Sequence, residues 1–255
     1  MPIITLTTDL GDSDYYVGAV KGYILSHCPP ATIVDISNKV RPFDVGHAAF
    51  LLRNAFREFP IGTTHLAHVQ SGRDAPDRNV LVVYDQHYFI GPDNGLFSMV
   101  VEPPVEVYAL KPRKPRSTFP TRDNLAPVAC DLLNGINPAE IGMRQENLVE
   151  LAMLRPAISP DGIRCNVIHT DHFGNVVLNL TRKRFEEARQ DRNFAVNLKG
   201  NNTIEALADT YSDVHQGEAL CLFNSAGYME LAVNSGHAAN LFGLAIGDSI
   251  RIDFI

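Results

Sequence analysis

The stretch that decides the fold is IITLTTDLGDSDYYVGAVKGYIL, residues 3–25, near the start of the chain. Residues 3–9 are short, β-branched and apolar, which is typical of a buried parallel strand, and the polar run after them predicts a turn. Between residues 15 and 27, apolar side chains recur every three or four positions, which predicts a helix capped by one of the polar residues 12–14. A buried strand, a turn and a helix in this order form the first unit of an α/β fold.

The same alternation continues beyond this first unit. Further strands are predicted at residues 31–37, 62–70, 79–85, 87–95 and 105–110, and further helices at residues 43–59 and 122–135. Strands and helices that follow one another in this way predict a mixed or parallel sheet covered by helices.

The pattern changes near Arg155, where helical periodicity fades. Six short β-type runs separated by Gly, Asn and Asp turns follow, at residues 162–171, 174–180, 193–200, 218–224, 227–234 and 248–254. So many short strands in about a hundred residues predict a small all-β barrel or sandwich. We therefore expect an α/β domain at residues 1–155 and a β-barrel domain at residues 156–255.

Composition excludes several classes of protein. Hydrophobic residues make up 45% of the 255 residues, which is enough for a sizeable core, and 22 basic against 29 acidic residues argue against a nucleic-acid partner. The chain has no signal-peptide pattern at its start and no apolar run of membrane-spanning length, so we expect a cytoplasmic protein without a membrane partner. Its four cysteines lack CxxC spacing, which favours buried free thiols.

Carboxylates gather after the first predicted strand. Asp9 lies at its carboxyl end, where open α/β sheets bind ligands, and a carboxylate there could accept both hydroxyls of a ribose or simply close a turn. Asp12 and Asp14 follow, and three carboxylates so close together could hold a divalent metal. Because no histidine or second acidic cluster completes a shell at a readable spacing, we expect no metal.

Three polar loops are further candidates for ligand contacts. Residues 91–95 form a tight loop that includes Asn94, and residues 224–227 form another. Residues 171–175 bring together an acid, an aromatic ring and an amide, which can pair with an amine, cover a planar base and bond its edge. Turn chemistry explains all three loops equally well. HExxH, GxSxG, Walker A and methyltransferase GxGxG patterns are missing from the sequence, so none of those enzyme classes is favoured.

Taken in order, these motifs resemble one family across nearly the whole chain. The segments that carry the resemblance are TTDLGDSDYYVGAVKGYIL, IVDIS, RPFDVGHAAFLL, GTTHLAHV, IGPDNGLFS, TDHFGNVVLN and NSAGYMELAVNSGHAANLFG. The chain resembles the S-adenosyl-L-methionine (SAM) hydroxide adenosyltransferases, whose relatives include fluorinating and chlorinating enzymes that use the same substrate. The resemblance implies an N-terminal α/β domain, a C-terminal β-barrel, no cofactor beyond the substrate SAM, and a homotrimer that binds SAM between neighbouring subunits.

The resemblance also assigns substrate contacts. It implies that Asp9 binds the ribose diol, that Asp14 lies near the methionine amino group and that Phe43 flanks the sugar and sulfonium. From the neighbouring subunit, it implies contacts with the amino acid and the adenine by Asp171, Phe173 and Asn175, and with the methionine carboxylate by the loop of Ser225. Position 226 is Ala, where the fluorinating relatives have an arginine.

The reaction centre departs from the family pattern. Members that use hydroxide read VVDPGVG and TFHGRD, which supply an Asp and a His that work with an Arg on the attacking water. Here the matching segments are HVQSGRDAPDR and TFPTRD, so Gln70 replaces the Asp, Pro120 replaces the His, and Arg78 is the best-aligned arginine. Neither glutamine nor proline accepts a proton at neutral pH, so the usual water-activating set is absent.

Two other residues could serve as a base for water. His68 lies two positions before Gln70, so on a strand both side chains point to the same face, about 7 Å apart. Asp74 lies in the loop itself. A packed imidazole and a solvated turn acid are the structural alternatives for these two residues.

A halide is an alternative nucleophile because it needs no base, and Thr121, next to Pro120, could donate to an anion. The long insertion of the fluorinating enzymes, however, has no room between Arg78 and Pro92. We therefore expect an enzyme that displaces methionine from C5′ of SAM with water, giving adenosine. Halide transfer and non-catalytic binding of SAM or adenosine are the alternatives.

Overall fold

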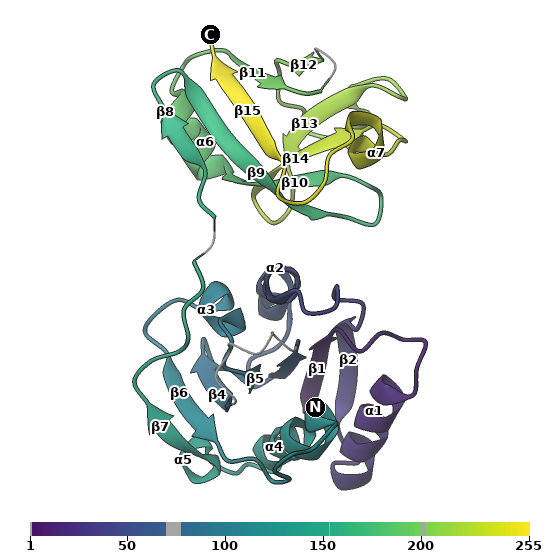
Figure 1. Ribbon diagram of the computed structural model, residues 1–255, viewed down its shortest axis with the longest axis vertical. Helices are drawn as coiled ribbons and strands as arrows, with labels where there is room; N and C mark the ends of the chain where they lie inside the picture. Colours follow the sequence, from purple (N-terminus) through teal and green to yellow (C-terminus); the bar gives the residue numbers. More distant parts are fainter. Residues whose placement is uncertain (1, 70–77, 153, 200–201) are drawn as a thin grey trace. The chain divides into compact units, whose positions relative to one another are not determined.

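A computed structural model of the chain describes residues 2–69, 78–152, 154–199 and 202–255. The chain divides into two compact units, Met1–Ala152 and Met153–Ile255, shown in Figure 1. Each unit has its own sheet and its own hydrophobic core. Within the described ranges, no helix combines the length and the apolar character needed to cross a bilayer.

The first unit is built on a seven-stranded mixed sheet of order β2-β1-β3-β5-β4-β6-β7. Its strands are β1 (Ile3–Thr8), β2 (Thr32–Ser37), β3 (Thr64–His68), β4 (Asn79–Tyr84), β5 (His87–Pro92), β6 (Glu106–Leu110) and β7 (Gly142–Gln145). Strands β2, β1, β3 and β5 pair in parallel, while β4, β6 and β7 pair antiparallel. The carboxyl ends of the four parallel strands therefore lie at one edge of the sheet.

Helices cover both faces of this sheet. They are α1 (Tyr16–His27), α2 (Val45–Ala55), α3 (Leu96–Val100), α4 (Ala126–Leu133) and α5 (Pro138–Ile141), with a 3-10 turn at Phe56–Glu58 and a π-helical turn at Thr121–Leu125. Alternate residues of each strand face opposite sides, so Leu66 packs in the core under α1 and α4, whereas Ala67 packs in the core under α2 and α3. This two-sided burial explains the continuous apolar character of the central strands.

The second unit is an antiparallel, barrel-like sheet of order β12-β11-β15-β9-β10-β14-β13, with β8 paired to β9. Its strands are β8 (Ala157–Ser159), β9 (Gly162–Thr170), β10 (Val176–Thr181), β11 (Phe194–Asn197), β12 (Thr203–Ile204), β13 (Ala219–Phe223), β14 (Tyr228–Val233) and β15 (Ser249–Phe254). Two helices, α6 (Arg182–Arg189) and α7 (Ala238–Phe242), and a 3-10 turn at Tyr211–Asp213 complete it. The predicted fold class, an α/β region followed by an all-β barrel-like region, is confirmed.

Local predictions differ from the structure in two ways. The predicted side-chain cap of α1 is wrong: Tyr15 precedes the helix and makes no capping bond, while Asp12 pairs with Lys39 at 2.8 Å. Several elements of five residues or fewer were also missed, because they are too short to show a period; they are α3, α5, α7, β7, β8 and β12. The four cysteines are free and buried, as expected.

Candidate active site

The candidate reaction centre lies at the carboxyl ends of β1 and β3. Thr8, the last residue of β1, pairs in register with His68, the last residue of β3, and Asp9 follows directly. The Nδ1 atom of His68 lies 2.8 Å from Oγ1 of Thr121, and both side chains are buried. Two residues that are 53 positions apart in sequence therefore form one hydrogen-bonded pair beside Asp9.

Burial determines the charge of this pair. Desolvation lowers the pKa of His68 to about 4, and the opposing influence of the Asp9 carboxylate is smaller, so the imidazole is neutral at pH 7. Its Nδ1 either donates to Oγ1 of Thr121 or accepts from it. In the part of the chain that the structure describes, Nε2 of His68 has no hydrogen-bond partner. The first tautomer presents Nε2 as a proton acceptor, and the second presents it as a donor.

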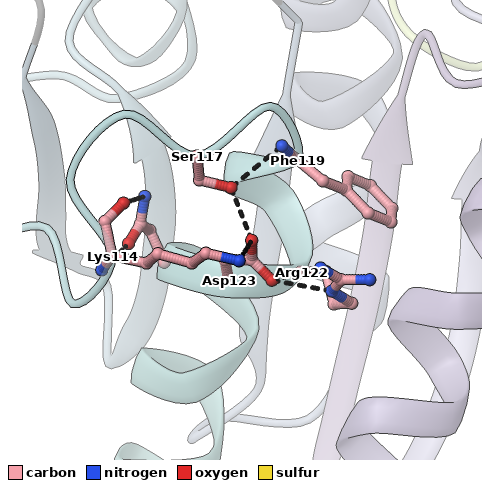
Figure 2. A network of polar contacts seen from close by, with 6 residues as sticks. Lys114, Ser117, Phe119, Arg122 and Asp123 are labelled. Carbon is pink, nitrogen blue, oxygen red and sulfur yellow. Dashed lines mark hydrogen bonds and ion pairs between the residues drawn. The ribbon is translucent and has the colours of Figure 1, made fainter.

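A polar network surrounds Asp123, two residues after Thr121, and Figure 2 shows its members. Oγ of Ser117 donates to Asp123 at 2.5 Å and accepts from the backbone N–H of Phe119 at 2.9 Å. Arg122 and Lys114 also pair with Asp123, at 2.7 and 3.2 Å. The Ser117 hydroxyl, followed by these cations, lowers the pKa of Asp123 to about 2, so its charge persists at all working pH values.

The loop before α2 is held by Asp9. Its Oδ2 accepts the backbone N–H of Phe43 at 3.0 Å. Phe43 has φ +65°, a left-handed conformation that costs a residue with a bulky side chain about 1 kcal/mol or more. Its ring is 70% exposed. A carboxylate retains acceptor capacity beyond one bond, so Asp9 can hold this strained aromatic residue and still accept from a diol.

The remaining candidates of the first unit differ in their surroundings. Asp14 is exposed on the turn before α1. Nδ2 of Asn94 donates to the carbonyl of Val69 at 2.9 Å, so this buried amide fixes the backbone just after β3. Gln70 and Asp74 lie outside the described residues.

Arg78 is engaged in an ion pair. Its Nε donates to Asp93 at 2.6 Å, its Nη2 also contacts that carboxylate, and Asp93 is only 1% exposed. The other oxygen of Asp93 accepts the backbone N–H of Val149 at 2.8 Å. The guanidinium thus anchors the start of β4 to the segment that leaves the first unit.

In the second unit, Asp171 organises the predicted acid–aromatic–amide turn. Its Oδ1 accepts the backbone N–H groups of Phe173 and Asn175 at 2.9 and 2.8 Å, and its Oδ2 accepts the Asn175 amide at 3.0 Å. The Phe173 ring is 72% exposed, whereas Asn175 is buried. Ser225 is exposed in the turn between β13 and β14.

Family models match both units of the chain. The SAM hydroxide adenosyltransferase N-terminal domain matches residues 4–142, and the corresponding C-terminal domain matches residues 165–251. The chain belongs to the SAM hydroxide adenosyltransferase family. This confirms the resemblance carried by the sequence motifs.

Relatives within the family are enzymes of two kinds. The chain is 30% identical to the (R)-S-adenosyl-L-methionine hydrolase of Methanocaldococcus jannaschii, over 99% of this chain and 96% of that protein. It is 28% identical to a fluorinase of an Actinoplanes species, over 98% of this chain and 97% of that protein. A crystal structure of an uncharacterized conserved protein from Thermotoga maritima superimposes with a TM-score of 0.87 at 32% identity, over 98% of this chain and 99% of that one.

The structure joins two residues that the sequence analysis assigns to different nucleophiles, water and halide. His68 is predicted as a base for water and Thr121 as a donor to an anion, yet they are hydrogen-bonded to each other. Sequence reasoning missed the bonds of Asp93 and Asp123, although Asp93 lies within the 91–95 loop and Asp123 ends the TFPTRD segment. Among the described residues, no group of His, Cys, Asp and Glu could hold a metal ion.

Proposed function

We propose that this protein hydrolyses SAM at the ribose C5′ carbon, giving adenosine and L-methionine. The observation that carries the proposal is the neutral His68–Thr121 pair beside Asp9, at the carboxyl ends of two parallel strands. Ligands bind at this edge of open α/β sheets. Family membership and the names of the hydrolase relatives support the same reaction.

In the proposed reaction, a lone pair of the water oxygen attacks C5′ and the bond between C5′ and sulfur breaks. Its electron pair passes to sulfur, so methionine leaves as a neutral thioether and needs no proton. The water loses one proton to Nε2 of His68 and then to solvent, which leaves adenosine. Catalysis therefore depends mainly on aligning water with the C5′–S bond and removing solvent around it.

The low pKa of His68 fits a late proton transfer. An imidazole with a pKa of about 4 is a weak base and does not generate free hydroxide at neutral pH. The water oxygen becomes strongly acidic as its bond to C5′ forms, so a weak base that is neutral and well placed is enough. On this account, turnover is lost only as the pH falls towards 4 and His68 becomes protonated.

A halide nucleophile is the second candidate. When Thr121 donates to Nδ1 of His68, Nε2 carries the hydrogen and can donate to an anion. The alignments favour water: the fluorinase alignment runs over 289 positions and the hydrolase alignment over 266, against 255 residues here. The fluorinase thus carries additional segments that this chain lacks.

Substrate contacts follow the family pattern in this proposal. Asp9 binds the ribose diol, Asp14 lies near the methionine amino group, and Phe43 flanks the sugar and the sulfonium. The adenine and the amino acid are bound from the neighbouring subunit by four residues: Asp171, Phe173, Asn175 and Ser225. We take the R epimer at sulfur as preferred, because the hydrolase relatives carry that epimer in their names. We also propose a homotrimer, on the family resemblance, and a cytoplasmic location, to which four buried free thiols are suited.

The test is product analysis with matched variants. Purified protein is incubated with each SAM epimer, with and without chloride, and products are separated by liquid chromatography with mass detection. Adenosine in both buffers is expected, 5′-chloro-adenosine would transfer the protein to the halogenases, and intact bound SAM would make it a binding protein. His68→Gln and Thr121→Val should lower turnover about a hundredfold or more. The control is His65→Gln, which changes a buried histidine of the same strand outside the His68–Thr121 pair and should not lower turnover.

A further inference from the structure

The second unit contains a buried carboxylate that the proposed reaction does not use. Glu230 lies on β14 and is 3% exposed. Its Oε1 accepts the Tyr211 hydroxyl at 2.8 Å, and its Oε2 accepts the amide of Asn224 at 2.9 Å. In the described part of the chain, no cation pairs with it. Burying an acidic side chain with only neutral donors around it costs free energy, so stability alone does not account for this residue.

The acid determines which way the amide of Asn224 points. A carboxylate only accepts hydrogen bonds, so Asn224 must turn its NH2 group towards Glu230 and its Oδ1 away. That Oδ1 accepts the backbone N–H groups of Ala226 and Tyr228 at 3.1 and 3.2 Å. The backbone N–H of Gly227, at φ +78°, donates to the Asn224 carbonyl at 2.8 Å. The amide orientation therefore fixes the turn of residues 224–227, in which Ser225 is exposed.

The same network extends towards the other binding turn of this unit. Burial, followed by the Glu230 carboxylate, raises the pKa of Tyr211 to about 12, so its hydroxyl remains a donor at all working pH values. The Asp171 carboxylate acts on Tyr211 in the same direction, which places it within electrostatic reach of the phenol. Glu230 thus bonds to the 224–227 turn through Asn224, and Tyr211, its other partner, is within electrostatic reach of Asp171 in the 171–175 turn.

We propose that Glu230 is a positioning residue: through the Asn224 amide it holds the 224–227 turn so that Ser225 meets the carboxylate of the substrate's methionine end. This inference rests on the proposed function, because it takes SAM as the substrate. The position of Ser225 is important in this chain because residue 226 is Ala, so no cationic side chain at position 226 holds the substrate carboxylate.

The test exchanges donor and acceptor between the two residues. In Glu230→Gln, the new amide keeps one acceptor oxygen, which the Tyr211 hydroxyl occupies, and turns its NH2 group towards Asn224. The Asn224 amide then flips and withdraws Oδ1 from the two backbone N–H groups. In the double variant Glu230→Gln/Asn224→Asp, the new aspartate accepts from the glutamine and from both N–H groups, so the turn is restored. Glu218→Gln, an exposed acid of the same unit, is the matched control.

Two readouts separate positioning from general stability. Glu230→Gln should raise the KM for SAM about tenfold or more with kcat within about twofold, since one or two bonds to the turn are lost. It should leave KM unchanged for decarboxylated SAM, which lacks the carboxylate. The double variant should restore KM, and Glu218→Gln should not change it. In the ligand-free protein, amide hydrogen exchange at Ala226 and Tyr228 should rise in the single variant and return in the double variant.

An unchanged KM and an unchanged exchange rate in Glu230→Gln would overturn the inference. So would a double variant whose KM for SAM stays raised, or a KM raised equally for SAM and decarboxylated SAM. If the unaltered protein turns over neither form of SAM, the proposed function fails. The exchange rates then still decide whether Glu230 holds the turn.

Discussion

Acid should destabilise the first unit through a buried histidine that lies outside the reaction centre. His65, on β3, is fully buried. Its Nδ1 is hydrogen-bonded to Oγ1 of Thr5 at 2.7 Å, and its Nε2 lies 3.1 Å from Nδ1 of His87. Desolvation, and to a smaller extent His87, lowers the pKa of His65 from 6.5 to about 3. The folded chain therefore holds this imidazole neutral where the unfolded chain protonates it.

The size of the effect follows from linkage. Between pH 6.5 and 3 the unfolded state binds the extra proton, so the free energy of unfolding falls as the pH falls through this window. At pH 5, which is 1.5 units below the unfolded pKa of 6.5, the cost is about 2 kcal/mol relative to pH 7.5. His68, with a pKa of about 4, adds a similar loss over pH 6.5 to 4.

The assay is urea unfolding at pH 7.5, 6 and 5, followed by circular dichroism at 222 nm because the chain has no Trp. Between pH 7.5 and 5, the free energy of unfolding of His65→Gln should fall by about 2 kcal/mol less than that of the unaltered protein. His27→Gln, an exposed histidine of the same unit, should show the unaltered pH dependence. Equal pH dependence in His65→Gln and the unaltered protein would refute the reasoning.

Three further substitutions test other parts of the account. Gly91→Ala would place a Cβ 2.0 Å from the Ala67 carbonyl oxygen and should cost roughly 2–4 kcal/mol in urea unfolding; a cost below about 1 kcal/mol would contradict the close strand approach. Phe43→Gly should keep stability within about 1 kcal/mol, because relief of the positive φ offsets backbone entropy, yet weaken SAM binding by calorimetry; unchanged affinity would remove Phe43 from the site. Asp171→Ala leaves three N–H donors of its turn unpaired and should weaken SAM binding about tenfold or more, and equal affinity would argue against a role for this turn.

The sequence predicts the fold well where apolar periodicity is long. The strand of residues 3–9 and the helix of residues 15–27 appear within one residue at each end, because burial on one or two faces leaves a clear pattern. Helix α3, with five residues, and the two-residue strand β12 leave no such pattern. The cap of α1 was mispredicted because the helix begins one residue later than expected, which puts Tyr15, and not one of residues 12–14, at the capping position.

The candidate site was predicted less completely than the fold. Motifs make Asp9 and Asp171 candidate substrate contacts because each ends or opens a recognisable segment. The bond between His68 and Thr121 joins residues 53 positions apart, and sequence spacing carries no information about such a contact. The orientation of the Asn224 amide by Glu230 is equally invisible, since it depends on which atom of an amide faces a buried carboxylate.

The central claim is that water attacks C5′ of SAM at the His68–Thr121 pair. The most direct measurement is a reaction in water enriched in oxygen-18, with mass analysis of the adenosine and methionine formed. The account predicts adenosine labelled at its 5′ oxygen, unlabelled methionine, and loss of the labelled product in His68→Gln. Unlabelled adenosine, or labelled adenosine formed at an undiminished rate by His68→Gln, would contradict it.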